Sequence, residues 1–117
     1  MDEMSDSILF SIKKSLGITH DYTHFDLDII QAINSVFSIL TQLGVGPSDG
    51  FKIVDGTAKW SEYLNDDLTL NLVQSYMFGK VRLIFDPPAS ATVTESMNRM
   101  LSELEWRIAN SPSVMGE

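Results

Sequence analysis

Two histidines four residues apart in an acidic segment are the arrangement in this chain that most resembles a metal site. The segment reads HDYTHFD and contains His20 and His24. A spacing of four can place both imidazoles on one side of a helical turn, as a zinc site requires. The segment is, however, typical of a loop that leads into a helix, where acids in the first turn favour the helix dipole. We therefore expect no bound metal.

The other residues with catalytic potential form no recognisable catalytic set. Glu103 and Glu105 would lie on different sides of a helix, so they cannot act as an acid–base pair. No serine lies in a nucleophile elbow, and the absence of cysteine excludes thiol nucleophiles, disulfides and thiolate metal sites. Gly44 and Gly46 follow a helix rather than a strand, which indicates a helix stop and not a phosphate loop. The sequence predicts neither enzymatic activity nor a cofactor.

The charge balance limits the classes of partner. The 117 residues carry 16 acidic and 8 basic side chains, which gives a formal net charge of −8. Binding to DNA through its phosphates requires clustered Lys and Arg, whereas here Lys13 and Lys14 are the one adjacent basic pair. We expect no direct DNA binding. The start MDEMSDSILF is acidic and lacks a long apolar run, so we expect neither a signal peptide nor a membrane span.

Apolar residues recur at helical spacing over most of the chain. The pattern predicts helices over residues 7–17 and 25–44, from about 70 to 85, and from about 90 to 109. The second helix has two apolar stripes, so we expect it to be central and packed from more than one side. Residues 61–67 form a short helical turn or loop, and a loose tail begins at about residue 110. Length and composition predict a single domain over residues 1–117.

Capping residues suggest where these helices begin and end. Gly17 and Gly44 should end the first two helices. A corner follows the third helix at residues 86–88, because each of the two prolines restricts the residue before it. The expected N-caps are, in chain order, Ser5 or Asp6, then Thr23 together with Asp26, and finally Ser90 or Thr92.

One segment has a β pattern. Residues 51–60, FKIVDGTAKW, alternate around Asp55–Gly56, which suits a two-residue hairpin turn. We therefore predict a β-hairpin here, with Lys52 opposite Lys59 on its outer face, an unfavourable pair unless acidic groups lie nearby. The inner face would pack on the helices and would carry Phe51, Ile53, Ala58 and Trp60. The predicted fold class is mainly α, a small bundle of about four helices with one inserted hairpin.

Large side chains that the core does not require are candidates for contacts between proteins. Trp106 lies between Glu105 and Arg107, away from the apolar stripe of the last helix. It is either half-buried against a neighbouring helix or an anchor for another subunit, since Trp is enriched in interface hot spots. The candidate interface residues are Lys52, Lys59, Trp60 and Trp106. The stripe itself, which should suffice to pack the helix, comprises Val93, Met97, Met100, Leu101, Leu104 and Ile108.

The stretch KVRLIFDPPASATVTESMNRMLSELEWRI resembles the head–tail connector (adaptor) proteins of long-tailed bacteriophages and prophages. The opening ILFSIKKSLGI, the segment DLDIIQAINSVFSILTQLGVGP and the segment FKIVDGTAKWSEYL are similar to that family in order and spacing. The resemblance implies a structural protein that forms a ring of about a dozen copies beneath the portal, joins head to tail and extends the DNA channel. It implies no catalysis and no cofactor.

The partners that the resemblance implies are the portal protein, neighbouring copies of the chain in the ring, and the next neck or tail protein. DNA would pass through the channel without specific binding, and no membrane would be involved. The protein would lie at the head–tail junction of the virion, and in the host cytoplasm during assembly. The corner at residues 86–88 would join the packed core to a helix that meets neighbouring subunits, or it is an ordinary turn within one bundle.

Two other classes stay open. One is a different neck protein, such as a stopper or tail-completion protein, although those tend to be β-rich and the helical periodicity argues against them. The other is a small acidic helical regulator or inhibitor that binds a host protein through its charged surface.

Metal independence is the first testable consequence. A chelator is expected to leave the melting temperature unchanged, because neither His20 nor His24 would hold a metal ion on which the fold depends. Thermal unfolding followed by circular dichroism, with and without chelator, measures this. A fall of several degrees that zinc restores would show instead that the two histidines are ligands.

Overall fold

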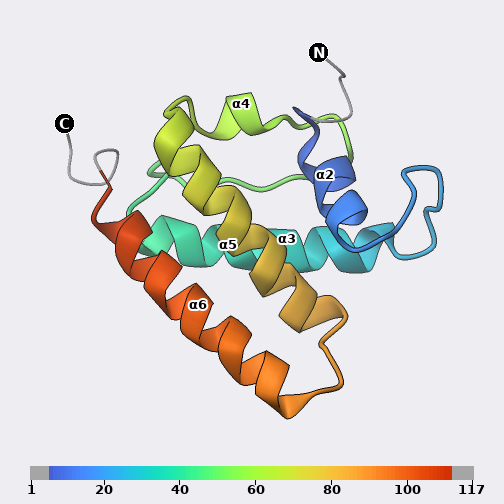
Figure 1. The fold of residues 1–117 in the computed structure, drawn as a ribbon. Coiled ribbons are helices and arrows are strands. Elements are labelled where there is room, and N and C mark those ends of the chain that lie inside the picture. Colours follow the sequence, from blue (N-terminus) through green and yellow to red (C-terminus); the bar gives the residue numbers. More distant parts are fainter. Residues whose placement is uncertain (1–5, 112–117) are drawn as a thin grey trace.

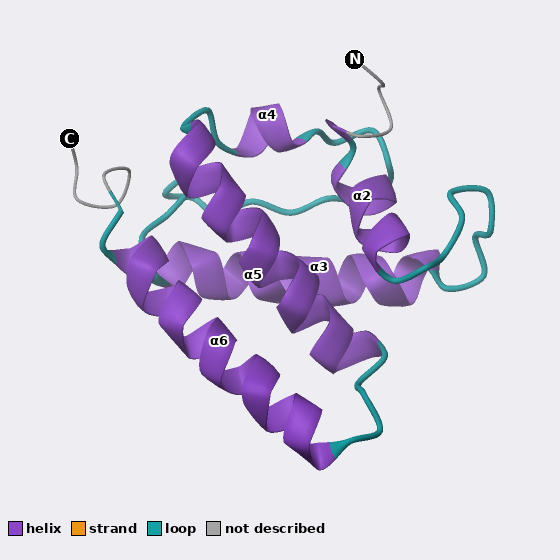
Figure 2. Cartoon of the chain, in the orientation of Figure 1, coloured by secondary structure: helices purple, strands orange, loops and turns teal. Residues whose placement is uncertain are grey.

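The computed structural model describes residues 6–111, which form helices joined by loops (Figure 1, Figure 2). The predicted mainly helical class is confirmed. No strand occurs between residues 6 and 111, so the predicted β-hairpin over residues 51–60 is wrong. The helices are α2 (Ile8–Ser15), α3 (Asp26–Gln42), α4 (Trp60–Tyr63), α5 (Asp67–Phe85) and α6 (Ala91–Ala109).

α3 is the central helix, as its two apolar stripes predict. It packs against α2 and α5, and Figure 1 shows α5 crossing it. The ring of Phe37 contacts Phe51, Trp60 and Tyr63 from the segment that follows α3, at centroid distances of 5.1, 6.4 and 4.7 Å. Core side chains therefore lie on two sides of α3. Its buried residues are Ile29, Ala32, Ile33, Val36, Phe37 and Leu40.

Three of the predicted helix boundaries are confirmed. Gly17 and Gly44 directly follow the C-caps of α2 and α3 and adopt φ values of 80° and 94°, a conformation that glycine tolerates without strain. Ser90 is the N-cap of α6, where its hydroxyl accepts a hydrogen bond from the Val93 N–H at 3.3 Å. Of the expected tail, Asn110 is the C-cap of α6 and Ser111 is buried, while residues 112–117 lie outside the described part.

Two of the helices do not have the N-caps that the sequence predicts. α2 is capped by Ser7 rather than by Asp6, whose carboxylate accepts a hydrogen bond from the Ser61 hydroxyl at 3.1 Å. The Ser7 hydroxyl also donates a hydrogen bond to the Gly56 carbonyl at 2.8 Å, and the alternative cap Ser5 lies outside the described residues. α3 begins after Phe25 without a side-chain cap, so Thr23 does not serve there.

The third helix starts earlier than its apolar pattern predicts. α5 begins at Asp67 rather than at about residue 70, because Asp66 caps it by accepting a hydrogen bond from the Leu68 N–H.

The predicted hairpin does not form because each of its limbs finds backbone partners elsewhere. The Asn34 side chain of α3 accepts a hydrogen bond from the Ile53 N–H at 2.8 Å and donates one to the Ile53 carbonyl at 3.0 Å. On the second limb, the Ile8 N–H donates to the Ala58 carbonyl at 3.0 Å, and Ser7 and Lys59 form an isolated antiparallel bridge. These contacts hold the two limbs on α3 and on α2 separately. The Thr57 N–H, which a two-residue turn would pair with the Val54 carbonyl, donates instead to Asp55 Oδ1 at 2.9 Å.

The alternation of residues 51–60 nevertheless describes their burial correctly. Ile53 and Trp60 are buried, and Phe51 and Ala58 are partly buried against the core. Lys52 and Lys59 are exposed on the other side. Because there is no ladder, the two lysines are not a cross-strand pair.

α6 is attached to the rest of the molecule through α5. A Cβ atom placed on Gly79 would lie 2.9 Å from Leu101 Cδ2, so glycine allows a close approach of the two helices. The Tyr76 hydroxyl donates a hydrogen bond to Glu105 Oε2 at 2.6 Å. Burial and the neighbouring Glu105 carboxylate raise the pKa of Tyr76 well above its ordinary value. The tyrosine therefore remains a neutral donor to Glu105 at physiological pH.

Replacement of Asn34 with Ala tests whether its side chain holds the segment around Ile53 on α3. The change leaves the N–H and the carbonyl of Ile53 without their side-chain partner, so we expect the free energy of unfolding to fall by about 1–3 kcal/mol. Urea denaturation measures the loss. Ser35→Ala, on the exposed side of the same helix, should change stability by less than about 0.5 kcal/mol. Equal effects of the two changes would contradict the role given to Asn34.

Candidate interaction surface

Trp106 is the largest exposed apolar side chain on α6. It is 69% exposed, so the alternative of a half-buried ring does not apply to the single chain. Beside it, Arg107 and Glu103 form a surface ion pair at 2.9 Å, which such exposure makes weak and easily exchanged. Asn110 Nδ2 donates a hydrogen bond to the Trp106 carbonyl at 2.8 Å and fixes the last turn beneath the ring. An exposed aromatic ring with a polar border has the composition of an interface anchor.

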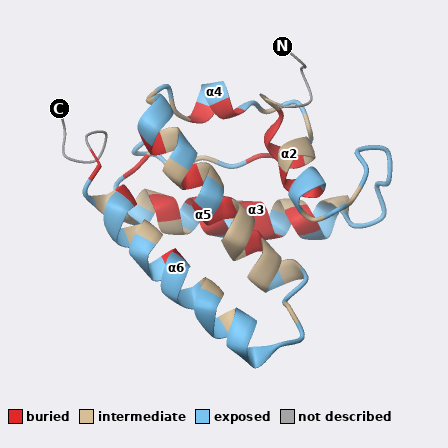
Figure 3. Cartoon of the chain, in the orientation of Figure 1, coloured by how far each residue is buried: buried red, intermediate tan, exposed pale blue. Residues whose placement is uncertain are grey.

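The apolar stripe of α6 is only partly covered by α5. Leu101 and Ile108 are buried, but Val93 and Met100 are 46% and 50% exposed. Figure 3 shows the first half of α6 as largely exposed. The stripe therefore packs only part of α6 within the chain: Leu101 and Ile108 are buried, whereas Val93 and Met100 are about half exposed. The first half leaves apolar surface free for another chain.

The three remaining candidates differ in their exposure. Lys52 and Lys59 are exposed and lie on the segment between α3 and α4, where a partner can reach them. Trp60 is 1% exposed and its Nε1–H donates a hydrogen bond to the Ser11 hydroxyl at 2.9 Å. Its side chain fills the core and offers a partner no surface in this structure. The structure thus does not bring Trp60 and Trp106 into one site.

A buried lysine anchors the loop that joins α2 to α3. Lys13 is fully buried, and its ammonium donates hydrogen bonds to the carbonyls of His20 and Tyr22 at 3.0 and 2.7 Å. It also forms an ion pair with Asp26 Oδ1 at 2.8 Å. The loop and the first turn of α3 are therefore tied to α2 by one side chain. Lys13 lies four residues after Leu9, on the apolar side of α2, and this spacing is the sequence signal that could have identified it.

The histidines of that loop pack against aromatic rings. His20 lies edge-on to Phe10 at 5.9 Å, and His24 lies edge-on to Phe25 at 4.7 Å. Within residues 6–111, no group of His, Asp and Glu side chains has the arrangement of a metal site. Over the same range, no helix has the length and apolar character needed to cross a membrane.

An open groove adjoins the loop, where α2, α3 and α5 meet. Its apolar wall includes Phe25 and Phe85, whose rings pack edge-to-face at 5.4 Å. Asp28 and Asp86 contribute carboxylates to the lining. Periodicity and motifs do not predict this groove, because it forms only when residues 16–32 pack against the distant residues 84–86.

Comparison with known proteins gives one family match. The model of the family described as phage connector protein matches residues 8–113. Comparison with curated proteins and with solved structures gives no match to either.

Substitution of Lys13 with Met tests the tie between α2 and the loop. Removal of one partner of a buried ion pair leaves Asp26 and two carbonyls without their donor, so we expect a loss of about 3–5 kcal/mol in the free energy of unfolding. Lys14→Met is the matched control, since Lys14 is exposed. This change should alter the free energy of unfolding by less than about 0.5 kcal/mol. Chemical denaturation of both variants decides the point. A Lys13→Met variant as stable as the parent would show that the Lys13 ammonium does not stabilise the loop between α2 and α3.

Proposed function

The chain belongs to the family of phage connector proteins, and from this premise we propose that it forms a ring beneath the portal that joins the head to the tail. Membership of the family supports a structural role in the virion. In our proposal, about a dozen copies form a closed ring that extends the DNA channel. The portal protein lies on one side of the ring, and the next neck or tail protein lies on the other.

The observation that carries this proposal is the exposed side of α6. A subunit in a closed ring needs a rigid surface that its neighbour can recognise, with apolar anchors inside a polar border. Trp106, which lies on the side of α6 away from the stripe, provides the anchor, and Glu103 and Arg107 are charged groups beside it. The hydrogen bond from Tyr76 to Glu105 and the close approach at Gly79 hold the second half of the helix rigid. We propose that this side of α6 packs against the adjacent copy.

Charge supports the same role. The net charge of −8 would make the wall of a DNA channel repel phosphate, so that DNA passes through without binding. The charged pair beside Trp106 consists of one acid and one base, so two copies can approach there without strong repulsion. We propose a non-enzymatic protein without a cofactor, located in the host cytoplasm during assembly and at the head–tail junction of the virion. The family assignment favours this role over that of an acidic regulator of a host protein.

Lys52 and Lys59 keep a proposed role although the hairpin is absent. Both are exposed in a strongly acidic chain, so acidic groups of a neighbouring copy or of the portal would be attracted to them. The change of both lysines to Glu should weaken portal binding without loss of the far-UV helical signal. Co-sedimentation with purified portal, with circular dichroism alongside, measures both properties. Unchanged binding by the double variant would reject this role for the lysines.

The substitution Trp106→Ala tests whether Trp106 acts as an interface anchor or as a residue of the folded core. Because the ring is largely exposed, we expect a loss of less than about 1.5 kcal/mol in the stability of the single chain, but a loss of about 2 kcal/mol or more in assembly. Denaturant unfolding gives the first quantity, and sedimentation with portal gives the second.

The control for this experiment is Leu68→Ala, another largely exposed apolar residue, at the start of α5. It should leave assembly unchanged. A Trp106→Ala variant that loses about 3–5 kcal/mol of folding stability would instead behave as a core residue, and the interface role would fail.

A further inference from the structure

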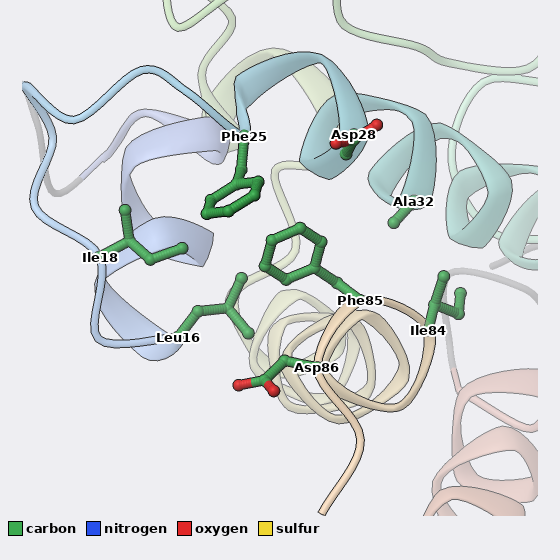
Figure 4. Close-up of a pocket in the computed structure, with 8 residues that line it drawn as sticks. All are labelled: Leu16, Ile18, Phe25, Asp28, Ala32, Ile84, Phe85 and Asp86. Atoms are coloured by element: carbon green, nitrogen blue, oxygen red, sulfur yellow. The ribbon is translucent and has the colours of Figure 1, made fainter.

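The groove between α2, α3 and α5 has an apolar wall that residues 6–111 leave open. It has a volume of about 660 Å³, and Figure 4 shows its lining side chains gathered from the three helices and the loop. Ile84 is 52% exposed and Phe25 is 36% exposed. Such a space can take one or two large side chains of a partner. The apolar lining residues are Leu16, Ile18, Phe25, Ala32, Ile84 and Phe85.

The polar lining of the groove is acidic. Asp28 and Asp86 are its charged members, and both are exposed. Within residues 6–111, the Asp28 carboxylate has neither an ion-pair nor a hydrogen-bond partner. Asp86 is the C-cap of α5, where the last carbonyls of the helix add partial negative charge. Arg82 offsets part of this charge, since its Nε donates to the Asp86 carbonyl at 2.6 Å and lies 3.9 Å from Oδ2.

We propose that this groove receives a segment of another protein in which a large apolar side chain is flanked by lysine or arginine. The apolar side chain would lie against Phe25, Ile84 and Phe85, and the flanking cations would meet Asp28 and Asp86. That the donor is a protein of the head–tail junction rests on the proposed function, whereas the chemistry of the groove does not depend on it.

A second copy of this chain fits the groove less well. Each copy carries a net charge of −8, so copies repel one another wherever an acidic surface meets an acidic surface. The exposed Trp106 has Glu105 on one side and the Arg107–Glu103 pair on the other. It would therefore bring no net positive charge to Asp28 and Asp86. A basic partner gains both the apolar contact and the electrostatic attraction.

The test uses the full chain and synthetic peptides. The probe is a capped peptide with a central Leu-Phe pair flanked on each side by Arg-Lys, titrated against isotope-labelled protein and followed by amide chemical shifts. Two control peptides replace Leu-Phe with Ala-Ala or replace the flanks with Glu-Glu. We expect shifts at Ile18, Phe25 and Phe85 with the probe, and affinities at least about fivefold weaker with either control peptide.

Matched variants locate the binding site. Asp28→Lys should weaken binding of the probe by at least about fivefold. Asp49→Lys makes the same charge change beyond the other end of α3, about 20 Å away, where salt screens it, and should change the affinity by less than about twofold. Ile84→Ser should also weaken binding of the probe by at least about fivefold. Val54→Ser changes an exposed valine outside the groove and should leave the affinity unchanged.

Several results would overturn the proposal. If the Ala-Ala peptide binds as tightly as the probe, the interaction is only unspecific charge attraction. If the Glu-flanked peptide binds as tightly as the probe, the two carboxylates of the groove play no role. Equal losses in the Asp28→Lys and Asp49→Lys variants would place the peptide elsewhere. Shifts at the groove on raising the protein concentration alone would identify a second copy as the occupant. Each of these results leaves the ring beneath the portal as it stands, since binding to purified portal tests that separately.

Discussion

The backbone restriction at Asp86–Pro87–Pro88 determines the arrangement on which the surfaces of this protein depend. Each proline excludes the helical conformation from the residue before it, so α5 must end at Phe85 and α6 can begin only after the corner. Arg82 closes the end of α5 by donating to the Asp86 carbonyl. Figure 1 shows the loop that follows α5 in the lower part of the molecule, with α6 running back from it beside α5. α6 therefore returns along α5 and not along the central helix.

Two surfaces follow from this geometry. α6 packs on α5, where the hydrogen bond from Tyr76 to Glu105 holds it in place, and its far side leaves Trp106 exposed. Because α5 stops at the corner, Phe85 and Asp86 line the groove beside the loop that Lys13 fastens. The first surface is bordered by the Arg107–Glu103 ion pair, whose charges cancel, and we propose it as the contact with another copy of the chain. The second is lined by Asp28 and Asp86, and in our proposal it binds a basic segment, so that one subunit would distinguish its neighbours by charge.

The sequence predicted the elements that local rules determine. Periodicity predicts the helical class and the placement of Trp106 outside the core of the chain. Capping preferences predict the glycines that end α2 and α3 and the Ser90 cap. The hairpin failed because a β pattern does not reveal that Asn34 and the start of α2 will satisfy the backbone of residues 51–60 instead. Lys13 and the groove were missed for a related reason, since their partners come together only when distant segments pack. The resemblance to connector proteins, which rests on order and spacing, is confirmed over residues 8–113.

The central claim is that the outer side of α6 joins neighbouring copies in a ring beneath the portal. A cryo-electron microscopy map of the protein bound to its cognate portal tests this most directly, because it shows both the symmetry and the contacts. The account predicts a closed ring in which Trp106 of each subunit is buried against the next subunit. A ring in which Trp106 faces solvent, or a portal complex without a ring of this chain, would contradict it.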